Sequence, residues 1–229
     1  MALYLQPTVS AIAQSSGTAA SLTTGAITTT SGNLIVVCVF SYDSNIGAAP
    51  VSDNKSNTYT HVIASFGTTQ GFGAMFFCPN ATGGASHTFT FTPSSNDFLS
   101  MGVLVIPNIK LTTPTWDFAV SSVDTATHAT AAISVGTANP GVFVGAGALS
   151  FTDEGSPYLT STYWSLVGRL AASGTQEGII MAYRVADTST SDAFTYSAAQ
   201  THNETIMTAS FVGQAQPTGS SGGASIFGG

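Results

Sequence analysis

The sequence predicts an all-β fold, an antiparallel β-sandwich built from two internally repeated halves of about six strands each. Thr and other β-branched residues are frequent, and turn-forming residues interrupt them roughly every 8–15 positions, a spacing typical of sandwiches and barrels. Residues 17–108 and 124–213 present the same order of features at an offset of about 106 positions. No segment longer than about ten residues combines a helical period with capping residues.

In the first half, apolar runs and alternating segments predict strands near residues 19–29, 33–42, 57–65, 72–78, 86–92 and 99–106. The run Leu34–Phe40 is continuously apolar, which is typical of a central strand covered on both faces. In the segment His87–Thr92 polar and apolar residues alternate, so Phe89 and Phe91 are expected on one face. Turn residues such as Ser31-Gly32-Asn33 separate these strands.

In the second half, the same reasoning predicts strands near residues 127–135, 141–150, 160–170, 177–185, 192–197 and 205–213. Matching positions relate the halves: Ile27 with Ile133, Asn57–Thr60 with Ser161–Trp164, Met75 with Met181, Phe89–Phe91 with Phe194–Tyr196, and Met101 with Met207. Gly145 and Gly147 lie inside a predicted strand with no helix after them. We therefore interpret them as close-packing positions and not as a dinucleotide-binding loop.

Three segments lie outside the two repeats, which are predicted to span residues 17–108 and 124–213. Residues 1–16 are expected to form an N-terminal arm and residues 109–123 a linker, in which Trp116 is a candidate core or interface anchor. Residues 214–229 are rich in Gly and Ser, the composition of a flexible linker. Because ordering such a tail costs about 1–2 kcal/mol per residue, we expect it to be ordered only by a neighbouring subunit, with Ile226 and Phe227 as apolar anchors.

The chain is poor in charge. Of its 229 residues 7% are charged, compared with about 25% in ordinary soluble domains, and the formal net charge is −7. Four scattered basic residues do not form the clusters that bind nucleic acid or an anionic membrane surface. The longest apolar run, Leu34–Phe40, is far shorter than the ~20 residues of a membrane-spanning helix. A nearly uncharged surface is typical of one that neighbours cover, so we expect a homo-oligomer; a monomer with a surface rich in Ser and Thr is the alternative.

The first residues and the two cysteines bear on the compartment. Residues 1–8 have neither the basic region nor the long apolar region of a secretory signal, so we expect a chain that is made in the cytoplasm and stays there or leaves inside a particle. Cys38 and Cys78 lie in two different predicted strands, and Ala146 and Arg184 stand near the matching positions of the second half. Two buried free thiols are expected, with a disulfide between adjacent strands as the alternative.

Motifs of catalysis and metal binding are missing from the chain. It has no G-x-S-x-G elbow and no G-x-x-x-x-G-K-[ST] loop. The four histidines lack the spacing of metal ligands: His61, His87, His128 and His202. One loop region is rich in the oxygen ligands that calcium prefers, but it lacks the EF-hand order and is better explained by turn formation: Asp43, Asn45, Asp53 and Asn54.

Two further residue sets allow chemistry in principle. Three carboxylates are candidates for glycoside hydrolysis, Asp153, Glu154 and Glu177, but the first two precede the turn sequence Gly155-Ser156-Pro157. Four aromatic residues are candidates for stacking on sugars, or for ordinary cross-strand pairs: Tyr42, Tyr59, Tyr163 and Trp164. The sequence assigns no catalytic residue, no metal ligand and no cofactor, and it predicts a protein that is not an enzyme.

Two local patterns resemble those of a known group of proteins. The first is Ser31-Gly32-Asn33-Leu34-Ile35-Val36-Val37, and the second is the segment Val51–Thr60, which is similar to a V-x-D-x-x-G-N-x-Y element with Ser56 in the place of the Gly. With the strand end Phe76–Ala81 they resemble β-sandwich structural proteins of tailed bacteriophages and of bacterial surfaces. The resemblance implies a jelly-roll-like structural or adhesive module with no catalytic residues to carry over.

These observations together predict a virion structural protein, of the capsid decoration, head-fibre or tail-associated type, that acts through subunit packing. Its expected partners are further copies of itself and other virion proteins such as a major capsid protein, and its expected location is the virion, assembled in the host cytoplasm. The alternative is a carbohydrate-binding or adhesive module on a phage or cell surface. An enzyme of unrecognised type is the third hypothesis.

Overall fold

The computed structural model describes residues 5–43, 46, 50–66, 71–110, 112, 114–123, 127–135, 140–149, 158–171, 177–186, 190–198 and 204–214. Within these ranges the chain forms β-strands joined by turns, and no α-helix is present. No helix of this part of the chain is therefore a candidate for crossing a membrane. The strands pair in an antiparallel manner throughout, so the predicted all-β sandwich fold is confirmed.

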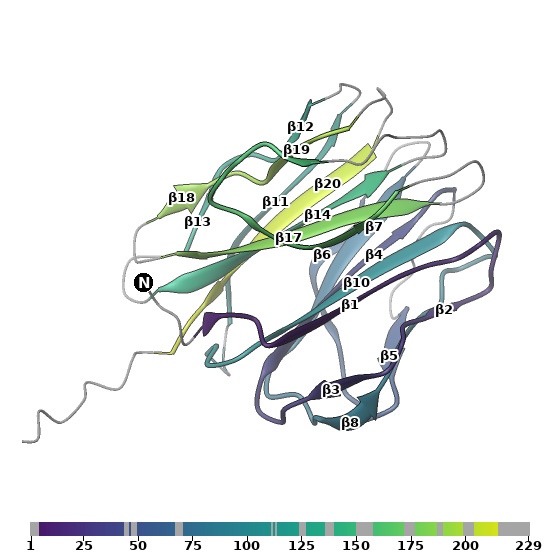
Figure 1. Cartoon of the computed structure of the whole chain (residues 1–229), viewed down its shortest axis with the longest axis horizontal. Coiled ribbons are helices and arrows are strands. Elements are labelled where there is room, and N and C mark those ends of the chain that lie inside the picture. The colour runs from purple at the N-terminus through teal and green to yellow at the C-terminus, as the bar shows by residue number, and fades with distance from the viewer. Residues whose placement is uncertain are drawn as a thin grey trace, which may run out of the picture.

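Two five-stranded sheets form the centre of the molecule (Figure 1). The strands of the first sheet are, in spatial order, β1 (Val9–Gln14), β10 (Leu99–Ile106), β4 (Leu34–Ser41), β7 (Phe72–Cys78) and β6 (Thr60–Phe66). Those of the second sheet are β11 (Thr115–Val123), β20 (Glu204–Val212), β14 (Gly141–Leu149), β17 (Gly178–Ala186) and β16 (Ser165–Leu170). In both sheets the first strand of the half lies beside its last strand. The order of strands is the same in the two sheets; superposition of the two halves stays a prediction.

The two large sheets pack face to face and share one apolar core. β1 lies against β16, β10 against β17, β7 against β20, and β6 against β11. The core between them takes side chains from both sheets, including Val36, Met75, Val144 and Met181. We call this the central core. Because neither sheet buries its inner face without the other, the two halves form one sandwich and not two separate ones.

Smaller sheets cover the outer faces, so the molecule has four layers (Figure 1). In the first half they are β2-β9-β5 and β3-β8, whose bounds are Leu22–Thr23, Phe89–Phe91, Val51–Asp53, Ile27–Thr29 and Gly84–His87. In the second half they are β12-β19-β15 and β13-β18, whose bounds are Thr127–Ala129, Thr195–Ser197, Tyr158–Leu159, Ile133–Ser134 and Ser191–Asp192. Each outer layer encloses its own apolar core, which contains Phe89 and Phe91 in the first half and Phe194 and Tyr196 in the second.

Strand β4 shows why its sequence is continuously apolar. Val36 and Cys38 face the central core, whereas Val37 and Val39 face the outer core of the first half, and all four are buried. The predicted central strand covered on both faces is therefore confirmed. The same alternation explains the cysteines, which are buried and free: Cys38 faces the central core and Cys78 the outer core. They point to opposite faces of one sheet.

The glycines of β14 make room for aromatic rings. A Cβ on Gly145 would stand 2.3 Å from Cγ of Phe194, and one on Gly147 would stand 2.3 Å from Cε1 of Tyr196. Contacts this short are not tolerated, so only glycine lets these rings lie flat on the strand. The interpretation of both residues as close-packing positions is confirmed.

Several sequence predictions need correction. Residues 9–14 of the predicted arm form the edge strand β1, and residues 115–123 of the predicted linker form the edge strand β11. The estimate of six strands in each half was too low, because ten short or long strands precede residue 107 and ten follow residue 114 within the described residues. The missed strands are of two kinds. The edge strands β1 and β11 lack a long apolar run, and the others have only two or three residues, so that their pairing depends on partners distant in the sequence.

The strand register also shifts two of the matched positions by one residue. Cys38 pairs with Met75 and Gly102, and Ala146 pairs with Met181 and Met207, so Met207 corresponds to Gly102 and not to Met101. Met101 faces the outer core, whereas Met207 faces the central one. Likewise, Thr60 pairs with Phe77 and Ser165 with Tyr183, so the preceding residues Tyr59 and Trp164 correspond to each other.

Candidate functional site

A buried carboxylate organises the loop after β5. Oδ1 of Asp53 accepts hydrogen bonds from the backbone N–H groups of Lys55 (2.9 Å) and Asn57 (3.1 Å). Its Oδ2 accepts from Nδ2 of Asn57 (2.8 Å) and from the hydroxyl of Tyr59 (2.6 Å). Ser56 adopts a positive φ of 60° to close this turn, which is the conformation that favours Gly. The polar residues of the V-x-D-x-x-G-N-x-Y pattern thus make one hydrogen-bonded turn.

A histidine links this turn to the outer sheet. Nε2 of His87 lies 3.0 Å from Oδ2 of Asp53, and both side chains are fully buried. On the other side of the ring, Nδ1 of His87 lies 2.7 Å from the hydroxyl of Thr29. Three strands, β3, β8 and β5, are therefore joined through their side chains. We call Thr29, His87, Asp53, Asn57 and Tyr59 the Asp53 cluster.

The Asp53 cluster has the order hydroxyl, imidazole and carboxylate that is found in hydrolases, but it lacks the access that catalysis needs. Thr29, in β3 of the outer layer, is buried, and neither of the two pockets described below includes it. Burial alone would raise the pKa of Asp53, but the hydrogen bonds from Tyr59 and Asn57 and the contact with His87 outweigh it and lower the pKa to about 2. Burial and the Asp53 carboxylate raise the pKa of Tyr59 far above its ordinary value. These shifts indicate that Asp53 is an ionised acceptor at neutral pH, which stabilises the fold.

The second half carries a polar group of similar position. Oδ2 of Asp192 accepts a hydrogen bond from Nε1 of Trp164 (2.9 Å) and forms an ion pair with Arg184. The guanidinium of Arg184 lies 4.9 Å from the ring centre of Tyr163, as in a cation–π contact. We call Trp164, Arg184, Asp192 and Tyr163 the Asp192 cluster. Its ion pair is partly exposed, in contrast to that of the Asp53 cluster.

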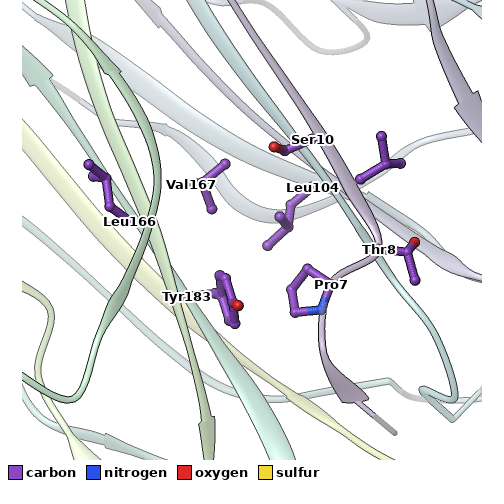
Figure 2. A pocket seen from close by; sticks show the side chains of 8 residues that line it. Pro7, Thr8, Ser10, Leu104, Leu166, Val167 and Tyr183 are labelled. Carbon is purple, nitrogen blue, oxygen red and sulfur yellow. The ribbon is translucent and has the colours of Figure 1, made fainter. Parts of the chain in front are cut away.

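A pocket opens where the edge strands β1 and β16 meet, a line that we call the first seam (Figure 2). The seam is closed at one end, because Nε2 of Gln14 donates to the carbonyl oxygens of Ala171 (3.2 Å) and Glu177 (2.9 Å). In its middle Ile12 packs on Gly168, where a Cβ would stand 2.5 Å from Cδ1 of Ile12. Beyond this point the strands leave a pocket of about 160 Å³, lined by Pro7, Thr8, Val9, Ser10, Leu104, Leu166, Val167 and Tyr183. Its walls carry no charged side chain.

The far end of this pocket is marked by a hydrogen bond from the hydroxyl of Tyr183 to Oε1 of Gln6 (2.9 Å). Figure 2 shows Leu166, Val167 and Tyr183 on one side of the pocket and Pro7, Ser10 and Leu104 on the other. A second pocket, of about 200 Å³, lies beside the Asp53 cluster and is lined by Val51, Asn57, Thr58, Tyr59 and Phe76. Both pockets are small compared with ligand sites of roughly 300–1,000 Å³.

The candidate interface anchors named from the sequence are not tested by this geometry. Trp116 lies in β11, but its side chain is outside the described residues, and so are Ile226 and Phe227 with residues 215–229. Of the aromatic candidates for sugar stacking, Trp164 is buried and Tyr59 is bound to Asp53, whereas Tyr163 is 71% exposed. Tyr42 makes an edge contact with Phe98.

The remaining candidates for chemistry are dispersed. The ring of His61 contacts Phe76 at a tilt, His87 belongs to the Asp53 cluster, and His128 stacks on Tyr196. Glu177 is buried at the first seam, whereas Asp153, Glu154, Asn45 and His202 lie outside the described residues. Asp53 forms a turn, as expected. The side-chain amide of Asn54 donates to the carbonyl oxygen of Ser86 and accepts from the backbone N–H of Thr88. The part of the chain that the structure describes contains no group of three or more residues arranged to hold a metal ion.

Comparison with protein-family models, with curated proteins and with solved structures gave no match. Sequence reasoning missed the link between Thr29 and His87 and the pocket of the first seam. The V-x-D-x-x-G-N-x-Y pattern did mark Asp53, Asn57 and Tyr59, although the pattern alone does not show that their side chains form hydrogen bonds with one another. No sequence signal points to the pocket, because its walls come from four separate segments.

Proposed function

We propose that this protein is a non-enzymatic structural subunit of a virion, of the capsid decoration, head-fibre or tail-associated type, which acts by packing against other subunits. The observation that supports this proposal best is the distribution of exposed apolar side chains. The described part of the chain exposes four large ones, and all of them belong to edge strands or to the segment beside one: Phe118, Tyr158, Tyr163 and Leu166. Apolar side chains at sheet edges favour association with a further chain.

The chemistry of the polar groups favours the same proposal. The side chains of Thr29, His87 and Asp53 are buried and bound into the fold, which favours a role in a rigid scaffold over contact with a substrate. With 7% charged residues, the chain offers few charges that a contact between copies would have to desolvate. A rigid, weakly charged body with apolar edges suits a role in which subunits pack side by side.

Size-exclusion chromatography with light scattering tests this proposal. We expect a mass above that of one chain, 23.2 kDa, that rises with protein concentration. Negative-stain electron microscopy of the same fractions should show particles of regular shape. A chain that stays monomeric at high concentration contradicts the proposal.

The tail gives a second test of subunit packing. Deleting residues 215–229 leaves Gln214, whose backbone N–H donates to the carbonyl of Asn108 (2.7 Å). If the tail anchors a neighbouring subunit through Ile226 and Phe227, the truncated chain should keep its far-UV circular dichroism spectrum but assemble more weakly. Equal assembly of the two chains would show that the tail has no part in it.

A carbohydrate-binding or adhesive module is the second candidate function. It is supported by Tyr158 and Tyr163, which are 61% and 71% exposed and lie five positions apart in the second half. Exposed tyrosines offer flat surfaces on which sugar rings stack. A glycan array compares the parent with Tyr158→Ala and Tyr163→Ala; binding that both substitutions abolish favours this candidate, and no binding by the parent removes it.

A further inference from the structure

The first seam has a counterpart on the opposite edge of the sandwich. There β11 and β6 meet, along a line that we call the second seam. The strand register relates the two seams. Ser10 of β1 pairs with Leu104, which pairs with Val36, and Phe118 of β11 pairs with Ala209, which pairs with Val144. Since Val36 and Val144 hold the same place in the two central strands, Phe118 stands where Ser10 stands.

Because Phe118 stands at the second seam where Ser10 stands at the first, the second seam carries a protrusion and the first seam a hole. Phe118 is 54% exposed, although it points to the same face of its sheet as Val120, which packs on the central core. At the first seam the small side chain of Ser10 forms part of the wall of a pocket of about 160 Å³. A cavity of roughly 150 Å³ with apolar walls accepts a benzene ring. The pocket thus has the volume and the uncharged lining that a phenylalanine side chain needs.

We infer that Phe118 of one copy inserts into the pocket of the first seam of a second copy, so that the protein associates head to tail. The inference rests on the proposed function, in that it names the surfaces by which copies of this chain pack. Because the two seams lie on opposite edges of the sandwich, each copy offers one protrusion and one hole. Such a contact is heterologous and produces a ring or a filament, not a closed two-fold dimer.

The length of the flanking strand β11 favours this contact. One phenyl ring alone buries far less than the roughly 1,000 Å² of a stable interface. The edge of β11, about 30 Å long at 3.3 Å per residue, supplies the additional area.

Two complementary variants test the inference, measured by sedimentation velocity over a range of concentrations. Phe118→Ser removes the protrusion and keeps the hole, and Ser10→Phe fills the hole and keeps the protrusion. We expect the parent to assemble and each variant alone to be monomeric, with self-association weakened at least tenfold. An equal mixture of the two variants should form a species of two chains and nothing larger, because only one protrusion and one hole remain free to meet.

Controls separate this inference from the proposed function. Ser52→Phe makes the same exchange as Ser10→Phe at an exposed position of β5 outside the pocket and should assemble like the parent, and circular dichroism verifies that every variant is folded. If Ser10→Phe does not fold, Ser10→Leu replaces it. A parent that stays monomeric contradicts both the proposed function and the inference. A parent that assembles together with variants that assemble equally well, or a mixture without the two-chain species, overturns the inference alone.

Discussion

The Asp53 cluster and the Asp192 cluster lie at corresponding places in the two halves but are built differently. In each, an aromatic residue immediately before an edge strand, Tyr59 or Trp164, donates a hydrogen bond to an aspartate of the outer layer. In the first half the aspartate belongs to β5 and His87 stands in β8. In the second half Asp192 itself takes the register position of His87, since each pairs with the matched residue Ile27 or Ile133.

The difference shows which part of the arrangement the fold requires. The common element is a polar link between the start of an edge strand and the outer sheet. The residue types that complete it vary: His87 and Asn57 in the first half, and Arg184, at the position of Cys78, in the second. The first link joins Asp53 to His87, and both of these side chains are fully buried, whereas the second is a partly exposed ion pair. Burial, more than the number of charges, should decide how much each link stabilises the fold.

The largest effect is expected where the two halves do not differ, in the central core. Val36→Asp and Val144→Asp each place an unpaired carboxylate among buried apolar side chains, and each should lower the free energy of unfolding by several kcal/mol. Urea denaturation followed by circular dichroism measures this, with the exposed Ser52→Asp as the control. A Val36→Asp protein that unfolds at the same urea concentration as the parent would contradict the core assignment.

The second effect compares the two clusters directly. Asp53→Ala leaves four donors and His87 without their acceptor in a buried site, so we expect a loss of about 2–4 kcal/mol. Asp192→Ala opens a partly exposed pair in which water replaces the lost oxygen, and we expect about 1–2 kcal/mol. Thermal or urea unfolding of both variants decides the order. Equal losses would show that solvent exposure does not separate the two links.

A third prediction uses the dependence of stability on pH. Burial lowers the pKa of His128 from 6.5 to about 4. Between these values His128 binds a proton in the unfolded chain but not in the folded one. The free energy of unfolding should therefore fall as the pH falls from 6.5 to 4, by at most about 1.4 kcal/mol per pH unit. In the register of the first half, Leu22 stands at this position. The variant His128→Leu should therefore lose this dependence between pH 6.5 and 4.

Asp53 provides the contrast in a lower range. Its pKa of about 2 lies below that of an unfolded aspartate, so its contribution is complete above about pH 4 and is lost as the pH falls toward 2. Urea midpoints of the parent and of His128→Leu, measured at half-unit pH intervals, separate the two ranges. A parent whose midpoint does not change between pH 6.5 and 4 would contradict the assigned role of His128.

The smallest effect concerns the turn of the Asp53 cluster. Ser56 has a positive φ of 60°, so Ser56→Gly removes the strain of its Cβ and should stabilise the protein by less than about 1 kcal/mol. A differential scan of the parent and the variant measures the shift in Tm. The matched substitution Ser52→Gly in β5 should destabilise instead, because a strand residue gains only flexibility. A lower Tm for Ser56→Gly would show that the Ser side chain contributes more than the strain costs.

The sequence was informative where one strand decides its own environment. The continuous apolar run of β4 and the alternation in His87–Thr92 predicted which faces are buried, and the structure confirms both. Gly145 and Gly147 were interpreted correctly because a glycine inside an apolar strand indicates close approach of another group. Local pattern and burial are directly linked in these segments.

Elsewhere the decisive partner is distant in the sequence. β1 and β11 were assigned to an arm and a linker, because an edge strand needs only one apolar face and its alternation is weak. The one-residue errors at Met101 and at Tyr59 arose in the same way: a shift of one position reverses the face of every side chain, and only pairing shows it. The pocket of the first seam brings together residues from both halves, and no single segment could indicate it.

The shared central core also has a consequence for the order of events during synthesis. When the first half has left the ribosome, Val36, Met75 and Leu104 have no second sheet to pack against, and the inner face of that sheet is exposed. At about 5–20 residues per second, the second half takes several seconds to follow. During this interval the nascent chain presents a wide apolar surface to its surroundings. Nascent chains on neighbouring ribosomes of one message can therefore pair their exposed sheets with one another. A chaperone that shields apolar strands should raise the yield of the folded protein.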